Sequence, residues 1–184
     1  MPEEIIIQKC APTLAGIKSG SLFSVKMTNE TDIYSEVREL NLILRKKGLR
    51  VLPLKTTKEY ALIYLYRPTH LKKDLKDPKA LSILRKRGYD YRNPDFCIVQ
   101  LVEHLKSDES FPHEIGLFLG YPPSDVECFM NNTRKGVKCC GTWKAYSDPE
   151  KAERTFKRYK ECTDNYWEMN KKGKTLSQLA VRTA

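Results

Sequence analysis

Two apolar runs flank the polar tetrapeptide TTKE between positions 50 and 66 of this chain. The first run reads RVLPLK, and the second, YALIYLY, consists of aliphatic and aromatic side chains alone. Two such runs joined by a short polar segment are typical of paired strands connected by a reversal of the chain. Since YALIYLY offers apolar side chains to both faces of a sheet, we expect it to be a central strand.

Helix signals lie on both sides of this predicted hairpin. Asp32, a residue type that caps helix starts, precedes apolar residues at helical spacing, namely Ile33, Val37, Leu40 and Leu44. Two lysines and then Gly48 supply the cationic last turn and the C-cap of that helix. Thr69, Asp77 and Asn93 mark further helix starts, and the last two are each followed by proline, which favours the first helical position.

Pairs of serine and glutamate at capping-box spacing predict two later helices. Ser124 and Glu127 lie in PPSDVECFMNN, and Ser147 and Glu150 precede a long helical stretch that ends at Gly173. The apolar residues of that stretch fall on one helical face: Phe156, Tyr159, Cys162, Tyr166 and Met169. We expect this to be the longest helix of the chain.

Three more stretches have the character of strands. The β-branched run EIIIQKC at 4–10 is followed by Pro12, EIGLFLG spans 114–120, and WKAY spans 143–146. The chain shows no repeat, low-complexity tract or linker, so helices and strands alternate within one domain over residues 1–184. We predict an α+β fold, with α/β as the open alternative. Its central mixed or antiparallel sheet would contain YALIYLY and EIGLFLG and be flanked by helices.

Length and composition fit a folded domain of 184 residues, of which 40% are hydrophobic. No run approaches the ~20 apolar residues that cross a bilayer, and MPEEIIIQKC has acids where a secretory signal carries positive charge. The expected location is therefore the cytoplasm. Six cysteines, at positions 10, 97, 128, 139, 140 and 162, lack the density of a secreted disulfide scaffold, and we expect reduced thiols.

Positive charge is concentrated in two segments of a chain whose net charge is +10. Residues 67–92 hold nine Lys/Arg against three acids, and residues 133–184 hold thirteen against six. This asymmetry favours an anionic partner, while solvated helix faces are the simpler interpretation. Aromatic residues between these cations suit a flavin or an acidic protein such as flavodoxin. The chain has no RNA- or DNA-binding signature, no P-loop and no G-x-G-x-x-G, which disfavours nucleic acid binding and nucleotide hydrolysis.

Three stretches together resemble one known family: KCAPTLAGIKSGSLF at 9–23, FPHEIGLFLGYPPSDV at 111–126, and GTWKAY with KRYKECTDNY at 141–166. On these motifs the chain is identified as a member of the domain of unknown function 3793 family, found mainly in anaerobic Firmicutes. The resemblance implies no activity, because the family has none established. Members often carry cysteines around the WK stretch, where this chain has Thr142, and they tend to be encoded near flavodoxins and ferrous-iron transport proteins.

Cys10, His113 and Glu114 form the first candidate site. A cysteine nucleophile needs a base to raise its thiolate fraction, a role open to His113, while Gln8 could donate to an oxyanion. The phrase HEIGLFLG also resembles the histidine-bearing strand of papain-like amidases, which implies hydrolytic or acyl-transfer chemistry. The simpler interpretation is that Cys10 is a buried small apolar residue and that His113 caps a strand.

A metal centre is the second candidate, drawn from Cys10, His113, Cys139 and Cys162, with Glu114 and Cys140 as further donors. Thiolate and imidazole ligands suit zinc or iron. The chain has no C-x-x-C or H-x-x-x-H pair, and adjacent cysteines point in different directions, which disfavours a shared ion. The alternative to thiol chemistry is therefore a non-enzymatic protein that binds a metal, a flavin or a flavodoxin.

Overall fold

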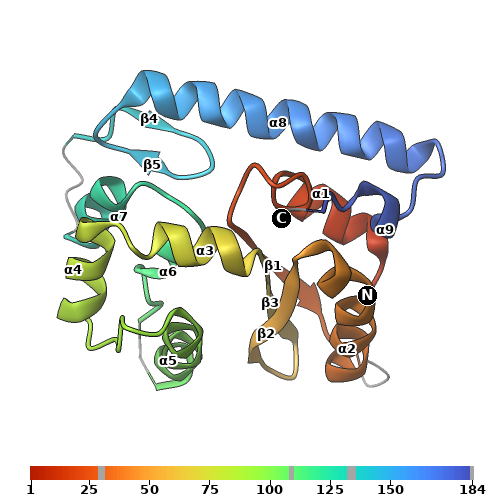
Figure 1. Ribbon diagram of the computed structural model, residues 1–184, viewed down its shortest axis with the longest axis horizontal. Helices are drawn as coiled ribbons and strands as arrows, with labels where there is room; N and C mark the ends of the chain where they lie inside the picture. Colours follow the sequence, from red (N-terminus) through yellow and green to blue (C-terminus); the bar gives the residue numbers. More distant parts are fainter. Residues whose placement is uncertain (29–31, 108–109, 132–135, 183–184) are drawn as a thin grey trace. The chain divides into compact units, whose positions relative to one another are not determined.

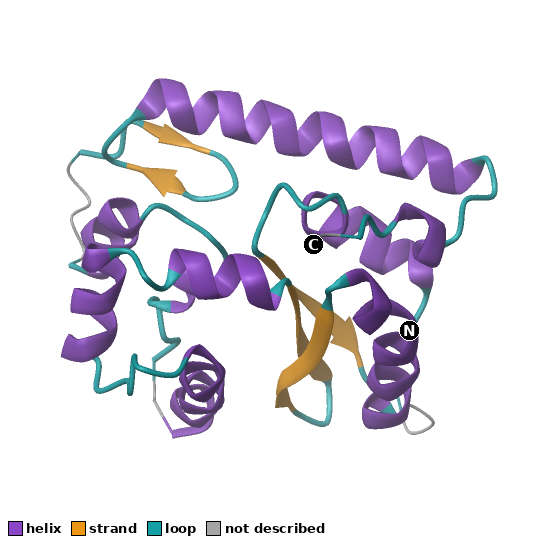
Figure 2. Cartoon of the chain, viewed as in Figure 1, coloured by secondary structure: helices purple, strands orange, loops and turns teal. Residues whose placement is uncertain are grey.

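The computed structural model describes residues 1–28, 32–107, 110–131 and 136–182. The chain divides into two compact units, the first built from residues 1–70 and 161–184 and the second from residues 71–160. Figure 1 labels the elements of both units, and Figure 2 distinguishes their helices from their strands. The combination of helices with antiparallel strands confirms the predicted α+β class.

The first unit contains α1 (Glu3–Leu14), β1 (Gly20–Lys26), α2 (Ile33–Leu44), the 3-10 helix η1 (Arg45–Lys47), β2 (Arg50–Thr56), β3 (Tyr60–Tyr66) and α9 (Leu176–Leu179). The second unit contains α4 (Pro78–Lys86), α5 (Pro94–Ser107), α6 (Ile115–Phe118), α7 (Pro123–Met130), β4 (Cys139–Cys140) and β5 (Lys144–Ala145). Two helices have residues in both units, α3 (Pro68–Asp74) and α8 (Pro149–Lys171).

The strands of the first unit form an antiparallel sheet in the order β1-β3-β2. YALIYLY is its central strand, β3, and pairs with β2 through the predicted hairpin. Thr57 closes the reversal, since its amide donates to Tyr60 O at 2.8 Å and its hydroxyl accepts from Tyr60 N at 3.0 Å. These local hydrogen bonds explain why the polar residues between the two runs turn the chain.

One face of this sheet carries Ala61, Ile63 and Leu65 into the core of the first unit. α1 packs on β1 and β3, α2 packs on β2, and α9 packs on α1. These helices contribute Ile6, Ile7, Cys10, Leu14, Ile33, Val37, Leu40, Leu44, Leu176 and Leu179 to the same core. Full burial of each large aliphatic side chain contributes roughly 1.5–3 kcal/mol to folding, so the helices are held mainly by this face.

Residues 3–14 are helical, so the strand predicted for EIIIQKC is wrong. Ile6, Cys10 and Leu14 recur at helical spacing and are fully buried, whereas the strand interpretation rested on the adjacent isoleucines. Pro12 lies inside α1 near its end. Burial of one helical face therefore outweighed the strand preference of the β-branched run and the helix-breaking tendency of Pro12.

EIGLFLG is not a strand either, and the predicted sheet does not include it. Ile115–Phe118 form the single turn α6, and every residue from 114 to 119 is buried. A short run buried on all sides lacks the periodicity by which a strand and a helix can be distinguished. Gly120, at φ 73°, follows this turn in the left-handed region that favours glycine.

Arg67 contacts three other segments of the first unit from a fully buried position. Its guanidinium donates to Thr13 O at 2.7 Å, Leu14 O at 2.6 Å, Lys47 O at 3.1 Å and Val181 O at 2.8 Å. Charge-assisted hydrogen bonds of this kind are the stronger ones in proteins. Arg67 therefore fixes the ends of α1 and η1 and the residues that follow α9.

Helix starts were predicted well where an aspartate caps the first turn. Asp32 accepts from Ser35 N at 3.1 Å, and Asp77 accepts from Lys79 N at 2.8 Å. Neither capping box predicted for the later helices forms. α7 follows Pro122 without a side-chain cap, and α8 follows Asp148, which accepts from the amide of its third helical residue at 3.0 Å.

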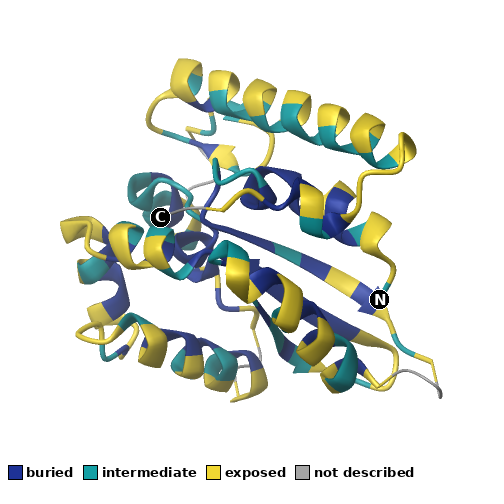
Figure 3. Cartoon of the chain, turned by 45° about the vertical axis from the view of Figure 1, so that its right-hand side comes forward, coloured by how far each residue is buried: buried dark blue, intermediate teal, exposed yellow. Residues whose placement is uncertain are grey.

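At 23 residues α8 is the longest helix of the described chain, as predicted. Figure 3 shows that much of its surface is exposed along its length. Its predicted apolar stripe is half-buried from Phe156 to Tyr166, and Met169 is exposed. Among the described helices, none combines the length and the apolar character needed to cross a bilayer.

Candidate functional site

Cys10 lies in the middle of α1 and is fully buried. Burial raises the pKa of its thiol to about 12, although nearby Lys18 and a hydrogen bond with Ser21 act in the opposite direction. A reactive cysteine needs a lowered pKa, so this environment is that of a structural thiol. Gln8 is exposed on the same helix, two residues away, where it does not share the buried side of Cys10.

His113 and Glu114 lie side by side in sequence before α6 but occupy different environments in the second unit. His113 is exposed, and its ring meets Phe129 edge to face with the centroids 4.9 Å apart. Glu114 is fully buried. Cys10 belongs to the first unit, so its pairing with His113 stays a prediction.

Glu114 is the centre of a buried polar cluster between α4, α5 and α6. Tyr89 donates to Glu114 Oε1 at 3.1 Å, and His104 Nδ1 lies 3.2 Å from the same oxygen. Arg87 Nε makes an ionic contact of 3.3 Å with Oε2. Burial, followed by the charge of Glu114, raises the pKa of Tyr89. Glu114 thus joins neighbouring elements of the second unit through the side chain that the first candidate site grouped with His113.

Among the described residues, no three His, Cys, Asp or Glu side chains are placed together to hold an ion. Cys10 and Cys162 belong to the first unit and His113 and Cys139 to the second, so a centre that combines them stays a prediction. Cys139 Sγ contacts Pro149 O at 3.7 Å, while Cys140 is exposed. The described residues include all six cysteines, and these form no disulfide. The metal alternative therefore has no supporting cluster in the described chain.

An aromatic pocket of about 380 Å³ lies within the second unit. Its rings belong to Phe111, His113, Tyr121, Phe129 and Trp143, and the other lining residues are Ile115, Gly116, Asp125, Val126, Cys140, Gly141, Thr142 and Lys144. The volume is within the range of roughly 300–1,000 Å³ typical of small-molecule sites. The segments HEIG at 113–116 and KCCGTWK at 138–144, which contain the candidate residues His113 and Cys140, meet in this pocket.

The rim of the aromatic pocket is open and carries a cation. Phe111 is 47% exposed and Phe129 is 37% exposed, so large apolar surfaces face solvent. Lys144 Nζ lies 5.5 Å from the centroid of the Phe129 ring. An ammonium near the face of a ring is favoured by the negative potential of that face. The pocket therefore offers flat apolar walls with a positive charge at one edge.

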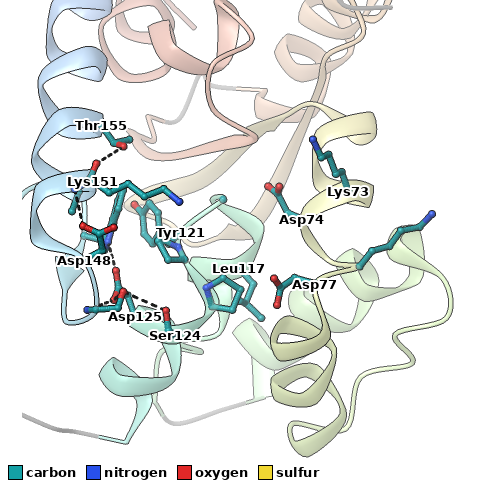
Figure 4. Close-up of a pocket in the computed structure, with 17 residues that line it drawn as sticks. Lys73, Asp74, Asp77, Leu117, Tyr121, Ser124, Asp125, Asp148, Lys151 and Thr155 are labelled. Atoms are coloured by element: carbon teal, nitrogen blue, oxygen red, sulfur yellow. Dashed lines mark hydrogen bonds between the residues drawn. The ribbon is translucent and has the colours of Figure 1, made fainter.

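A polar cleft of about 640 Å³ adjoins the aromatic pocket in the same unit. The two share Tyr121, Asp125 and Trp143 as lining residues. The charged side chains of the polar cleft besides Asp125 are Lys73, Asp74, Lys76, Asp77, Asp148 and Lys151. Figure 4 shows the residues that line the cleft, with α8 opposite α3 and α4.

Asp125 holds together the wall that the two cavities share. Its Oδ1 accepts from Tyr146 N at 3.0 Å, Ser147 N at 3.0 Å and Ser147 Oγ at 2.8 Å, and its Oδ2 accepts from Trp143 Nε1 at 2.9 Å. Burial raises the pKa of this carboxyl, but the four hydrogen bonds outweigh burial and hold the pKa below its ordinary value. Asp125 thereby anchors the loop after β5 and the indole ring to the first turn of α7.

Trp143 stands between two further rings. Its centroid lies 5.2 Å from Tyr121 and 4.6 Å from Phe156 of α8, the latter edge to face. Gly141 makes this arrangement possible, because a Cβ at that position would lie 2.3 Å from Phe156 Cδ2. The glycine of the GTWKAY motif is therefore required by close packing against an aromatic ring.

The basic segments are partly neutralised at the surface of the second unit. Glu127 contacts Lys79 at 3.1 Å and Lys86 at 3.6 Å. Exposed pairs of this kind contribute only about 0–1 kcal/mol to stability. Arg134 and Lys135, counted in the second basic segment, lie outside the described residues. An anionic partner such as flavodoxin stays a prediction.

Tyr121, Asp125, Phe129 and Trp143 were not among the predicted site residues. Three of them stand inside the motifs that carried the family resemblance, Tyr121 and Asp125 in FPHEIGLFLGYPPSDV and Trp143 in GTWKAY. The signal available in the sequence was therefore an acid and an indole in two separate motifs.

These observations define an α+β protein whose second unit holds a ligand-sized aromatic pocket beside a polar cleft. A family described as "Protein of unknown function (DUF3793)" matches residues 6–180, and the chain belongs to this family. The match confirms the resemblance carried by the three motifs. Comparison with curated proteins and with solved structures gives no match.

Proposed function

We propose that this protein binds a small planar ligand that carries negative charge, and that the aromatic pocket receives the ring system of that ligand. The observation that carries the proposal is the meeting of HEIG and KCCGTWK in one pocket of about 380 Å³ lined by aromatic rings. Aromatic side chains bury large apolar areas and favour stacked or edge-to-face contacts with other rings. A flat heteroaromatic ligand uses both properties.

The charge of the ligand is inferred from Lys144. Its ammonium lies 5.5 Å from the Phe129 ring centroid, at the edge where a bound ring system would carry its substituent. A phosphate or carboxylate there would form a charge-assisted contact with the lysine. A flavin mononucleotide has this combination of a planar tricyclic ring and a phosphate, which makes it the first ligand to test.

Binding, and not thiol catalysis, is the function that the described residues support best. The fully buried Cys10, with a pKa of about 12, lacks the lowered pKa of a nucleophile. Cys140 is exposed and contributes to the lining of the aromatic pocket.

The test is a titration of the protein with flavin mononucleotide and with riboflavin, which has the same ring system without the phosphate. Trp143 reports on the pocket when the second tryptophan is removed by Trp167→Phe. We expect saturable binding of both flavins, with tighter binding of the phosphorylated one. The proposal fails if flavin mononucleotide does not saturate the protein at millimolar concentration.

Two variants distinguish the contribution of the Phe129 ring to binding from that of the Lys144 charge. Phe129→Ala should weaken both flavins on the order of tenfold or more, since loss of a stacking ring costs roughly 1–3 kcal/mol. Lys144→Ala should weaken flavin mononucleotide and leave riboflavin nearly unchanged. The matched control is Lys46→Ala, which removes an exposed lysine from the first unit and should alter neither affinity.

A further inference from the structure

The polar cleft is lined by carboxylates and ammonium groups that enter it from different sides. Figure 4 shows the carboxylates of Asp74 and Asp77 directed into the cleft from the α3 and α4 side, and the Lys151 side chain entering from α8. All three residues line the same cavity of about 640 Å³. Lys73 and Lys76 also line it and are exposed. Besides these two lysines, the cleft presents two carboxylates from the α3 and α4 side and the Lys151 ammonium from α8 to a molecule placed between them.

Two other acids of the cleft have structural roles. Asp125 accepts four hydrogen bonds, and Asp148 caps α8 through an oxygen 3.0 Å from Lys151 N. The cap that Asp77 gives to α4 uses Oδ1, from Lys79 N and Ala80 N, and not Oδ2. Asp77 thus combines a fixed position at a helix start with an oxygen that the cap does not use.

The side of the cleft near α8 offers groups that suit a carboxylate. Thr155 of α8 and Ser124 of α7 add hydroxyls to the ammonium of Lys151. Ser124 belongs to the first turn of α7, which carries no side-chain cap. The wall between these charges is apolar and aromatic, formed by Tyr121, Trp143 and prolines.

We propose that the polar cleft is a second binding site, for a zwitterion of the α-amino acid type with an apolar or aromatic side chain. The ammonium of the ligand contacts Asp74 and Asp77, its carboxylate contacts Lys151, and its side chain rests on Tyr121 and Trp143. Opposed charges at two sides of one cavity select a molecule that carries both charges and disfavour a molecule that carries one.

Three related probes test each charge separately: L-phenylalanine, N-acetyl-L-phenylalanine, which lacks the cation, and L-phenylalanine amide, which lacks the anion. Calorimetric titration should show binding of L-phenylalanine and weakening on the order of tenfold for each blocked form, since each loses a charge-assisted contact. Equal affinity for the three probes, or no heat of binding for L-phenylalanine at millimolar concentration, overturns the proposal.

Variants assign the charges to residues. Asp77→Asn keeps a helix-capping side chain and should weaken L-phenylalanine on the order of tenfold without changing the N-acetyl form. Lys151→Met should weaken L-phenylalanine and leave the amide unchanged. Asp74→Asn serves as a second acid variant, and unaltered Trp143 emission in each variant shows that the wall is intact.

Phe129→Ala distinguishes this site from the aromatic pocket, because Phe129 lines only the latter of the two cavities. L-Phenylalanine should bind this variant with unchanged affinity. Loss of L-phenylalanine binding in Phe129→Ala, together with normal binding in Asp77→Asn and Lys151→Met, places the amino acid in the aromatic pocket and overturns the inference. Flavin binding can fail or succeed independently of these results.

Discussion

The indole Nε1 of Trp143 donates a hydrogen bond of 2.9 Å to Oδ2 of the buried Asp125. The two residues are 18 positions apart, and their contact joins the segment between β4 and β5 to α7. Both line the aromatic pocket and the polar cleft. A change in this hydrogen bond should therefore alter the lining of both cavities.

Replacement of Asp125 tests this wall directly. Asp125→Asn places an amide donor opposite the Trp143 donor, and we expect a loss of roughly 1–3 kcal/mol in the free energy of unfolding. Asp125→Ala leaves all the donors without their acceptor and should cost more. Urea unfolding followed by Trp143 emission, in a Trp167→Phe background, measures both changes. Ser124→Ala is the control, because Ser124 reaches only Ser147 Oγ, at 3.4 Å.

Acid should weaken the second unit through the same carboxylate. The pKa of Asp125 is held below its ordinary value in the folded chain, because its hydrogen bonds outweigh burial. The unfolded chain then binds this proton more readily, so the contribution of Asp125 is present above about pH 4 and is lost as pH falls through the folded pKa. Unfolding free energies measured from pH 6 downward should fall more steeply in the native protein than in Asp125→Asn. Equal slopes would show that Asp125 does not contribute.

Gly141→Ala should displace the Trp143 ring. The new Cβ would lie 2.3 Å from Phe156 Cδ2, so the ring or the segment between β4 and β5 must move. Overpacking of this kind costs roughly 1–3 kcal/mol, and the emission of Trp143 should shift. Gly88→Ala is the matched control, since its Cβ meets nothing within 4 Å and only the φ of +81° is strained. That variant should lose stability without a change in Trp143 emission.

Alkylation tests the thiol hypothesis for Cys10. Under native conditions the exposed Cys140 should react with iodoacetamide first, and the buried Cys10 should react only when the first unit opens. Mass spectrometry of labelled peptides over time gives both rates, and urea-unfolded protein gives the reference rates. His113→Ala should leave the Cys10 rate unchanged. Rapid native labelling of Cys10 that His113→Ala slows would restore the predicted pair.

Lys18 should make the first unit more stable as pH rises above neutrality. Its side chain donates to Gly20 O, and burial lowers its pKa from 10.5 to about 8, with Cys10 acting in the opposite direction. Because the unfolded chain keeps this proton more tightly, the free energy of unfolding rises with pH once pH passes about 8.

The effect of Lys18 is best measured between about pH 7.5 and 9. At higher pH the unfolded chain loses the Cys10 proton before the folded chain does, because burial raises the pKa of Cys10 from 9.0 to about 12, and this lowers stability. The rise measured by urea unfolding at several pH values should be reduced in Lys18→Met. Lys46→Met, at an exposed position, should retain it. An unchanged pH profile in Lys18→Met would mean that Lys18 is solvated in the folded chain.

Features with a local cause were read correctly from the sequence. Asp32 and Asp77 cap helices because their carboxylates bond to amides two or three residues away, and the hairpin before YALIYLY turns through contacts of Thr57 with Tyr60. The apolar spacing of α2 likewise identifies its buried face. Each of these signals operates within one or two turns of chain, which is the range that a sequence pattern describes.

The tertiary structure decided that EIIIQKC and EIGLFLG form helical segments and not strands, because short apolar runs can be buried equally well as strand or helix. It also decided the composition of the site. The motifs around His113 and Trp143 were identified, and both line one pocket, but the wall depends on Asp125, whose partners lie 18 to 22 positions away. Sequence by itself determined the capped helix starts, the hairpin before YALIYLY and the buried face of α2. The pocket and the polar cleft were decided only by folding, because side-chain hydrogen bonds and ring packing between distant segments follow no local period.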